Sequence, residues 1–249
     1  MDIERTEYVK GKTYRFTVLT PCLFRMEYSE RGIFCAQKTQ MIANREFEAA
    51  PYTVSEKNGR LTIETEKARL IYTGGAFDGS SLRVELKNHL TAFTAVWHYG
   101  ETGHNLKGTT RTLDGADGAV PLEDGLFSRE GWAVISDKGS ILLTEDGWIE
   151  TRPDPEAEDL YFFGYGTDYS GCLKDYYKLT GAIPVLPKFA LGNWWSRYYK
   201  YTETSYLELM DHFENDEIPF TVGVIDMDWH LVEDVDPKYG SSWTGYTWN

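Results

Sequence analysis

Short apolar runs separated by turn residues make up the chain from Tyr14 to about Ile149. The clearest runs are five or six residues long and rich in β-branched and aromatic side chains, which favour extended backbone. They are Tyr14 to Leu19, Leu23 to Tyr28, Leu61 to Thr65, Ala68 to Thr73 and Leu82 to Leu86. Turn pairs such as Asn58-Gly59 lie between them. The pattern predicts a mainly β chain that begins with an antiparallel β-sandwich.

The pattern changes after the polar, proline-bearing stretch Thr151 to Asp159. Tyr161-Phe162-Phe163 predicts one more strand, and Asp168 to Leu179 predicts a helix that ends at Gly181. Its expected apolar side consists of Leu173, Tyr176, Tyr177 and Leu179. A connector between Pro184 and Pro187 follows. We therefore expect two domains, a sandwich over 1–183 and a second domain over 184–249.

The second domain carries a strand–helix–strand pattern. Phe189 to Trp195 and Phe220 to Ile225 are largely apolar and predict strands. Thr202 can cap a helix between them, whose apolar residues at helical spacing are Tyr206, Leu209, Met210 and Phe213. A helix between two apolar strands indicates parallel pairing. A complete (β/α)₈ barrel takes about 250 residues, and only about sixty follow Pro187, so an incomplete barrel is expected.

Charge excludes some partners. The net charge is −14, with 39 acidic and 25 basic residues, which argues against nucleic acid and against an anionic membrane surface. The charged N-terminus shows no secretory signal, and no apolar stretch reaches the roughly 20 residues of a membrane span. We expect a soluble, cytoplasmic protein without a membrane partner. Three cysteines without C-x-x-C spacing suggest neither a disulfide framework nor a zinc site, and no cofactor is indicated.

The residues richest in chemistry follow the second predicted strand of the barrel-like part. They form the run Ile225-Asp226-Met227-Asp228-Trp229-His230. In a continued strand, the two carboxylates would share a side about 6.6 to 6.8 Å apart. Neighbours on one strand cannot readily straddle a sugar, so they are not assigned as nucleophile and acid. Asp226 suits bidentate hydrogen bonding to sugar hydroxyls, and His230 is a candidate by location alone.

Other interpretations of this motif stay open. The two aspartates could satisfy backbone N–H groups in a turn after the strand. A D-x-D metal site of the kind used by nucleotide-sugar transferases is a further alternative, although no phosphate-binding group is visible nearby. The chain is aromatic-rich at 15%, and Trp194-Trp195 at the first strand end suits a sugar platform. Because side chains alternate along a strand, only one of the two indoles is expected to face a pocket.

Asp114 and Asp117 lie in the polar loop Thr109 to Gly118. Their spacing does not match a calcium-binding loop. From the residues alone the loop is an ordinary surface turn, although such a loop can also complete a neighbouring pocket.

Several motifs together resemble glycoside hydrolase family 31. They are Tyr161-Phe162-Phe163-Gly164-Tyr165-Gly166, Leu179-Thr180-Gly181, Pro184, Leu186-Pro187, Ala190-Leu191-Gly192 and Ile225-Asp226-Met227-Asp228. The resemblance is strong over about 161–249 and looser over 105–124. It implies a β-sandwich followed by a (β/α)₈ catalytic barrel, and it implies a retaining, exo-acting α-glucosidase or a relative such as an α-xylosidase.

The resemblance also implies roles. Asp226 would grip the 4- and 6-hydroxyls of the non-reducing sugar, Trp194 or Trp195 would line the same subsite, and Asp114 or Asp117 would reach the pocket mouth. Asp228 is a further sugar-binding candidate. Family members take the nucleophile and the acid from later barrel strands, so no catalytic residue and no metal ligand is expected within this chain. The chain alone is expected to be inactive and to self-associate through an unpaired barrel edge near Val222. A non-catalytic carbohydrate-binding module and the metal-dependent glycosyltransferase remain as alternatives.

Overall fold

The computed structural model describes residues 8–87, 95–108, 110, 112–233 and 235–240. The chain divides into two compact units, Met1–Ala182 and Ile183–Asn249. The expected domains, 1–183 and 184–249, stay a prediction, because compactness alone does not show that each part folds by itself. Trp243 and Trp248 lie outside the described residues.

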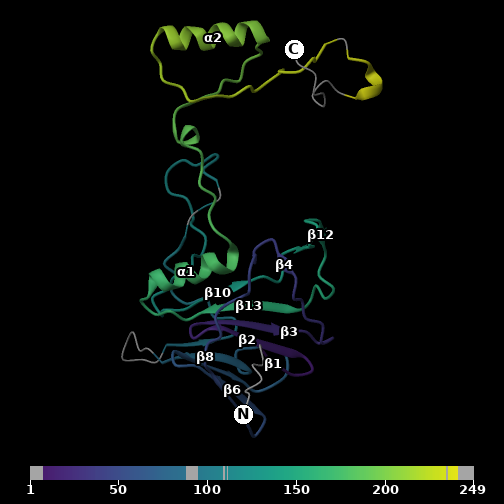
Figure 1. The fold of residues 1–249 in the computed structure, drawn as a ribbon, viewed down its shortest axis with the longest axis vertical. Coiled ribbons are helices and arrows are strands. Elements are labelled where there is room, and N and C mark those ends of the chain that lie inside the picture. The colour runs from purple at the N-terminus through teal and green to yellow at the C-terminus, as the bar shows by residue number, and fades with distance from the viewer. Residues whose placement is uncertain (1–7, 88–94, 109, 111, 234, 241–249) are drawn as a thin grey trace. The chain divides into compact units, whose positions relative to one another are not determined.

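Two five-stranded antiparallel sheets build the first unit (Figure 1). The first sheet has the order β1-β2-β3-β13-β10, with β1 Val9–Lys10, β2 Tyr14–Thr20, β3 Leu23–Tyr28, β13 Glu158–Phe163 and β10 Ala133–Ser136. The second follows chain order, with β5 Thr53–Lys57, β6 Arg60–Glu64, β7 Ala68–Tyr72, β8 Leu82–Leu86 and β9 Val96–His98. A small sheet pairs β12 (Ile149–Glu150), β11 (Leu142–Leu143) and β4 (Lys38–Thr39). The predicted mainly β, antiparallel character is confirmed.

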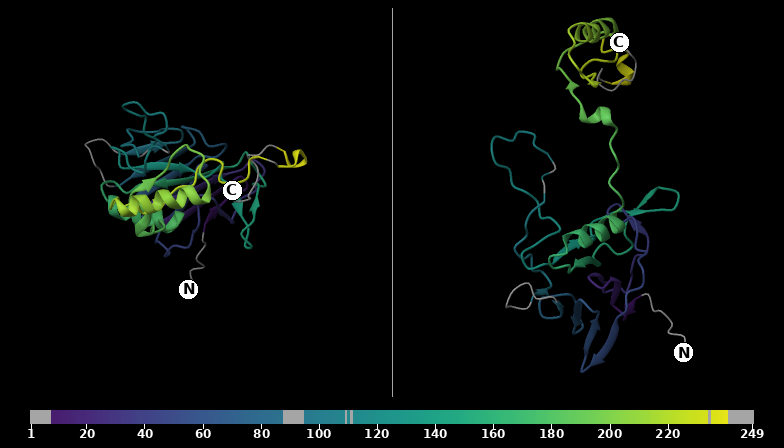
Figure 2. Two further views of the ribbon diagram at one scale, coloured as in Figure 1. Left: turned by 90° about the horizontal axis from the view of Figure 1, so that it is seen from above. Right: turned by 60° about the vertical axis from the view of Figure 1, so that its left-hand side comes forward.

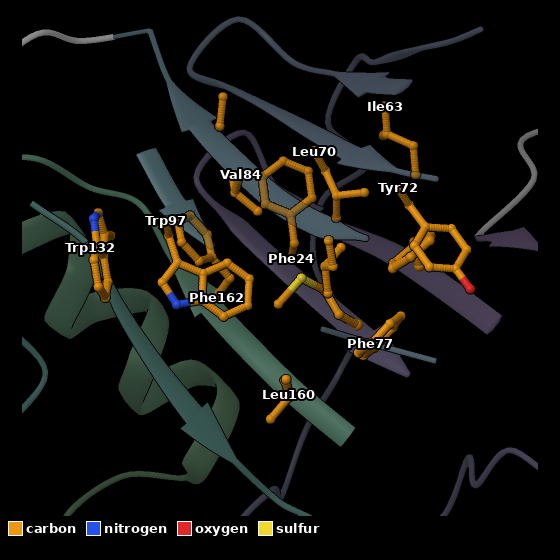
Figure 3. Packing of buried hydrophobic residues seen from close by; sticks show 14 of the residues in the cluster. Phe24, Ile63, Leu70, Tyr72, Phe77, Val84, Trp97, Trp132, Leu160 and Phe162 are labelled. Atoms are coloured by element: carbon orange, nitrogen blue, oxygen red, sulfur yellow. The ribbon is translucent and has the colours of Figure 1, made fainter. Parts of the chain in front are cut away.

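The core of this unit lies between the two large sheets (Figure 3). Alternation along the strands directs Phe24 and Phe162 from the first sheet toward Leu70, Val84 and Trp97 from the second. All five are at most 1% exposed, and the rings of Trp97 and Phe162 lie 5.5 Å apart. Each such burial contributes about 1.5 to 3 kcal/mol, so this layer fixes how the two sheets face each other.

Helix α1 (Tyr169–Thr180) covers the other face of the first sheet (Figure 1). The Asp168 side chain accepts a hydrogen bond from the Gly171 N–H at 2.9 Å, and Gly181 ends the helix at φ 97°. The prediction of the helix is therefore confirmed. The prediction of its apolar side was wrong in part. Leu179 is buried, but Leu173 and Tyr177 are 37% exposed, because the sheet contacts the line through Cys172 and Leu179 instead.

Charged side chains are buried on the same outer face of the first sheet. Arg25 on β3 donates two hydrogen bonds to Asp159 on β13, both of 2.8 Å, and lies 3.0 Å from Glu27. Arg152 donates to Asp159 at 3.1 Å and to Asp137 at 2.9 Å. We call Arg25, Glu27, Asp137, Arg152 and Asp159 the buried ion cluster. It links β3 and β13 to the segments that flank β11.

The second unit contains one strand–helix–strand arrangement. Strands β14 (Trp194–Trp195) and β15 (Val222–Gly223) pair in parallel, and α2 (Glu203–Asn215) connects them. Thr202 caps α2 through a reciprocal pair of hydrogen bonds with Ser205, which confirms the predicted cap. Parallel pairing is also confirmed. Neither α1, α2 nor any other helix in the described part has the length and apolar character needed to cross a bilayer.

The predicted lengths of these two strands were wrong. Lys188–Leu191 forms a 3₁₀ helix (η1), in which the Phe189 carbonyl accepts from the Gly192 N–H at 3.1 Å, so this stretch does not pair as a strand. A second 3₁₀ helix, η2, spans Pro237–Tyr239. Pro187 enters η1 at φ −58°, a value that suits a helix start. Apolar character alone could not distinguish this turn from a strand.

Candidate functional site

The candidate site is built on the carboxyl ends of β14 and β15. The Thr221 N–H donates to the Asn193 carbonyl at 2.9 Å, and the Val224 N–H donates to the Trp195 carbonyl at 2.8 Å. Parallel pairing brings both carboxyl ends to one edge, the edge where barrel enzymes place their binding groups. Asp226 follows β15 by three residues and is exposed. The second unit therefore brings the Trp194-Trp195 pair and Asp226 to neighbouring strand ends.

The two tryptophans occupy different environments. The Trp195 ring packs 4.8 Å from Phe213 of α2 and 5.8 Å from Phe220, with its indole N–H buried and without an acceptor among the described residues. Trp194 is 56% exposed, and its indole N–H donates to the Ala190 carbonyl at 3.0 Å. Trp195 therefore holds α2 against the strands, while much of the Trp194 ring is exposed.

This difference predicts effects of different size on stability for two matched variants, one at each tryptophan. Trp195→Ala is expected to lower the local stability of α2 by about 2 to 3 kcal/mol, because it removes the half-buried ring that packs against Phe213 and Phe220. Trp194→Ala is expected to change it by about 0.5 kcal/mol or less, as is usual for an exposed position. Amide hydrogen exchange of α2 in the intact chain measures both. Equal exchange rates in the two variants would contradict this assignment.

The aspartate motif does not continue as a strand. Met227 and Asp228 form a turn, with Asp228 in the left-handed region at φ 49°. The spacing of two carboxylates in a continued strand therefore does not apply to Asp226 and Asp228, because β15 ends at Gly223. His230 is only 3% exposed, and its ring lies 5.1 Å from that of Trp229. Among the described residues, no group of three His, Cys, Asp or Glu side chains is arranged to hold a metal ion.

Asp114 and Asp117 lie in the other unit, in the long loop that connects β9 to β10 and projects from the sheets (Figure 2). Both side chains are exposed. The Asp114 N–H donates to the Thr112 hydroxyl at 3.0 Å, and the Ala116 N–H donates to the Leu113 carbonyl at 3.0 Å, so the tip is folded locally.

Sequence reasoning missed an open pocket at the base of this loop. It has a volume of about 570 Å³, and its lining includes Thr102, Asn105, Lys107, Asp124 and Arg129. Lys107 adopts φ 68° and pairs with Asp124 at 2.5 Å. The polar residues of this loop were visible in the sequence. The sequence does not show that the two sides of the loop lie against each other.

Comparison with known proteins now bears on the site. The family profile described as "Glycosyl hydrolases family 31 TIM-barrel domain" matches residues 183–249, the part that contains β14, α2 and β15. An α-xylosidase of Saccharolobus solfataricus is 28% identical over 147 residues, which cover 57% of this chain and 17% of that protein. The segment 183–249 therefore resembles the barrel domain of glycoside hydrolase family 31. The resemblance seen in the sequence is confirmed.

Other similar proteins extend the match toward the N-terminus. "Alpha-glucosidase 2" of Bacillus thermoamyloliquefaciens is 26% identical over 210 residues, which cover 77% of this chain and 26% of that protein. A family 31 dextranase of Flavobacterium johnsoniae complexed with glucose shares the fold at a TM-score of 0.56 and 15% identity, over 90% of this chain and 34% of that one. A family 31 α-xylosidase from a soil metagenome, complexed with xylose, has a TM-score of 0.52 at 13% identity. The match covers 94% of this chain and 44% of that one. The chain thus spans about a quarter or less of the curated relatives.

Proposed function

We propose that this chain supplies the β-sandwich and the opening strand–helix–strand unit of an exo-acting, retaining α-glycosidase. The observation that carries the proposal is the exposed Asp226 at the carboxyl end of a parallel strand, within the segment that matches the family's barrel domain. The matched relatives are named an α-xylosidase and an α-glucosidase, which supports an α-linked glucoside or xyloside as substrate.

Exposed apolar side chains support the proposal that further barrel strands cover the second unit. Within its described part, helix α2 has no buried residue, and Leu191 is 75%, Phe189 57% and Ile225 47% exposed. Folded domains rarely leave so much apolar surface in one small unit uncovered. A complete barrel of about 250 residues would cover it. Left uncovered, the same surface favours self-association of the chain.

In this proposal the chain recognises the sugar and later strands break the bond. Asp226 accepts hydrogen bonds from two sugar hydroxyls, because an ionised carboxylate offers two oxygens in a fork. Trp194 presents an exposed indole face that can stack on the apolar face of a pyranose. We retain Asp228, Asp114 and Asp117 as candidate sugar ligands. The nucleophile and the acid, which flank the scissile bond in a retaining enzyme, come from further strands.

Hydrolysis assays test the proposal. The product of the complete reading frame is expected to hydrolyse p-nitrophenyl α-glucoside or p-nitrophenyl α-xyloside, and the 249-residue chain is expected to show no rate above background. Release of p-nitrophenol measures both. If the complete product binds these sugars without hydrolysing either, the chain is part of a carbohydrate-binding module instead. Hydrolysis by the 249-residue chain itself would overturn the assignment of catalysis to later strands.

A further inference from the structure

The long loop between β9 and β10 rises on two hydrogen-bonded legs. The Leu106 N–H donates to the Phe127 carbonyl at 2.8 Å, and the Gly108 N–H donates to the Glu123 carbonyl at 2.8 Å. Below them, the Arg129 N–H donates to the His104 carbonyl at 3.0 Å. We call residues 104–108 and 123–129 the stalk. Its paired backbone makes it stiffer than a free loop of the same length.

The Asn105 side chain makes three hydrogen bonds, two of which join the two legs. The Asn105 amide donates to the Gly125 carbonyl at 2.9 Å. Its side-chain oxygen accepts from the Gly125 N–H at 2.9 Å and from the Lys107 N–H at 2.7 Å. Three bonds from one part-buried amide satisfy backbone groups on both legs, so the loss of this side chain would leave those groups to water or unpaired.

Gly125 allows the legs to approach this closely. A Cβ atom at this position would lie 2.7 Å from the Lys107 carbonyl oxygen and 3.0 Å from the Gly108 nitrogen. These are backbone atoms, which cannot swing aside as a flexible side chain does. Gly125 is not among the residues at positive φ, so the requirement is steric. Any larger residue here must push the legs apart.

We infer that Asn105 and Gly125 are positioning residues that hold the loop tip with Asp114 and Asp117 in one place. Fixing a loop before its ligand arrives lowers the entropic cost of ordering that loop when the ligand binds. The expected effect on substrate binding rests on the proposed function, because it requires the loop tip to contact sugar. The stiffness of the stalk does not depend on that function.

Amide hydrogen exchange in the 249-residue chain tests the stalk directly. Gly125→Ala is expected to speed exchange at the Leu106, Gly108 and Arg129 amides by about tenfold or more, while the sheet amides keep their rates. The matched control is Gly139→Ala, because Gly139 has no atom within 4 Å of the added Cβ and does not adopt positive φ. The inference would be overturned if the stalk amides of Gly125→Ala exchanged at the wild-type rate. It would also be overturned if the sheet amides of that variant were accelerated as much as the stalk amides.

Variants of Asn105 distinguish the effect of its three hydrogen bonds from the effect of packing in general. Asn105→Ala removes all three bonds, whereas Asn105→Asp keeps the two accepting bonds and loses the donated one. Stalk exchange is therefore expected to rank wild type, Asn105→Asp and Asn105→Ala from slow to fast. In the product of the complete reading frame, Gly125→Ala is expected to raise KM about tenfold and change kcat less than about twofold. An opened stalk with wild-type KM would refute the positioning role, while an inactive wild-type product would count against the proposed function alone.

Discussion

Replacing Asp226 with alanine is expected to lower kcat/KM for α-glycosides by roughly 100-fold to 10,000-fold in the product of the complete reading frame. Hydrogen bonds to a charged group contribute about 1.5 to 3 kcal/mol each, and the proposed carboxylate makes two of them. Because Asp226 is exposed at a strand end, its removal is not expected to disturb the fold. Steady-state hydrolysis of both p-nitrophenyl substrates measures the effect.

The matched control for this variant is Asp211→Asn. Asp211 is an exposed carboxylate on α2 of the same unit, so it reports the general effect of removing one negative charge nearby. The control is expected to keep kcat/KM within about twofold. A wild-type kcat/KM for Asp226→Ala, with an unchanged melting temperature, would remove Asp226 from the site.

The sandwich could be predicted because its local signals agree with each other. The predicted Leu23 to Tyr28 and Leu82 to Leu86 coincide with β3 and β8. Asp168 and Gly181 marked the ends of α1 because capping is local chemistry that a sequence carries directly. Where propensity, turn residues and alternation all indicate the same element, that element can be predicted without knowing its tertiary contacts.

The second unit was harder to predict because its strands depend on partners distant in the chain. Apolar character predicted Phe189 to Trp195 as one strand, but pairing is limited to Trp194–Trp195. Likewise, the alternation of side chains along a strand predicted only that one of the two tryptophans faces a pocket. The choice between Trp194 and Trp195 required the positions of Phe213 and Phe220, which only the fold brings together. The stalk was missed for the same reason.

The buried ion cluster shows a second limit of pattern reasoning. Along β3, Arg25 and Glu27 alternate with Phe24 and Met26, the usual signature of one solvated face. The structure buries both faces, because α1 and the segments around β11 cover the outer one. Charges are retained there only because oppositely charged partners lie within hydrogen-bonding distance.

Arg25→Ala is expected to destabilise the first unit by about 3 to 5 kcal/mol, the usual cost of breaking a buried ion pair by removing one partner. Asp159 keeps its contact with Arg152 but loses both hydrogen bonds from Arg25. For a unit of this size, that corresponds to a fall in melting temperature of about 6 to 20 °C. Differential scanning calorimetry of the 249-residue chain measures it. The matched control is Arg69→Ala, because the Arg69 side chain is 42% exposed while it pairs with Glu64 and Glu85. The control is expected to cost about 1 kcal/mol or less.

Acid pH provides an independent check on the same cluster. Burial acts to raise the pKa of Asp159, but the hydrogen bonds and charge of Arg25, together with the charge of Arg152, outweigh burial and hold that pKa below its ordinary value. A lowered folded-state pKa stabilises the protein above the unfolded value of about 3.9 and loses that stability as pH falls through the folded value. Arg25→Ala lacks most of this contribution. The difference in melting temperature between wild type and variant is therefore expected to shrink below about pH 4. A difference that stays constant from pH 7 to pH 3 would mean that Arg25 acts through packing and not through its charge.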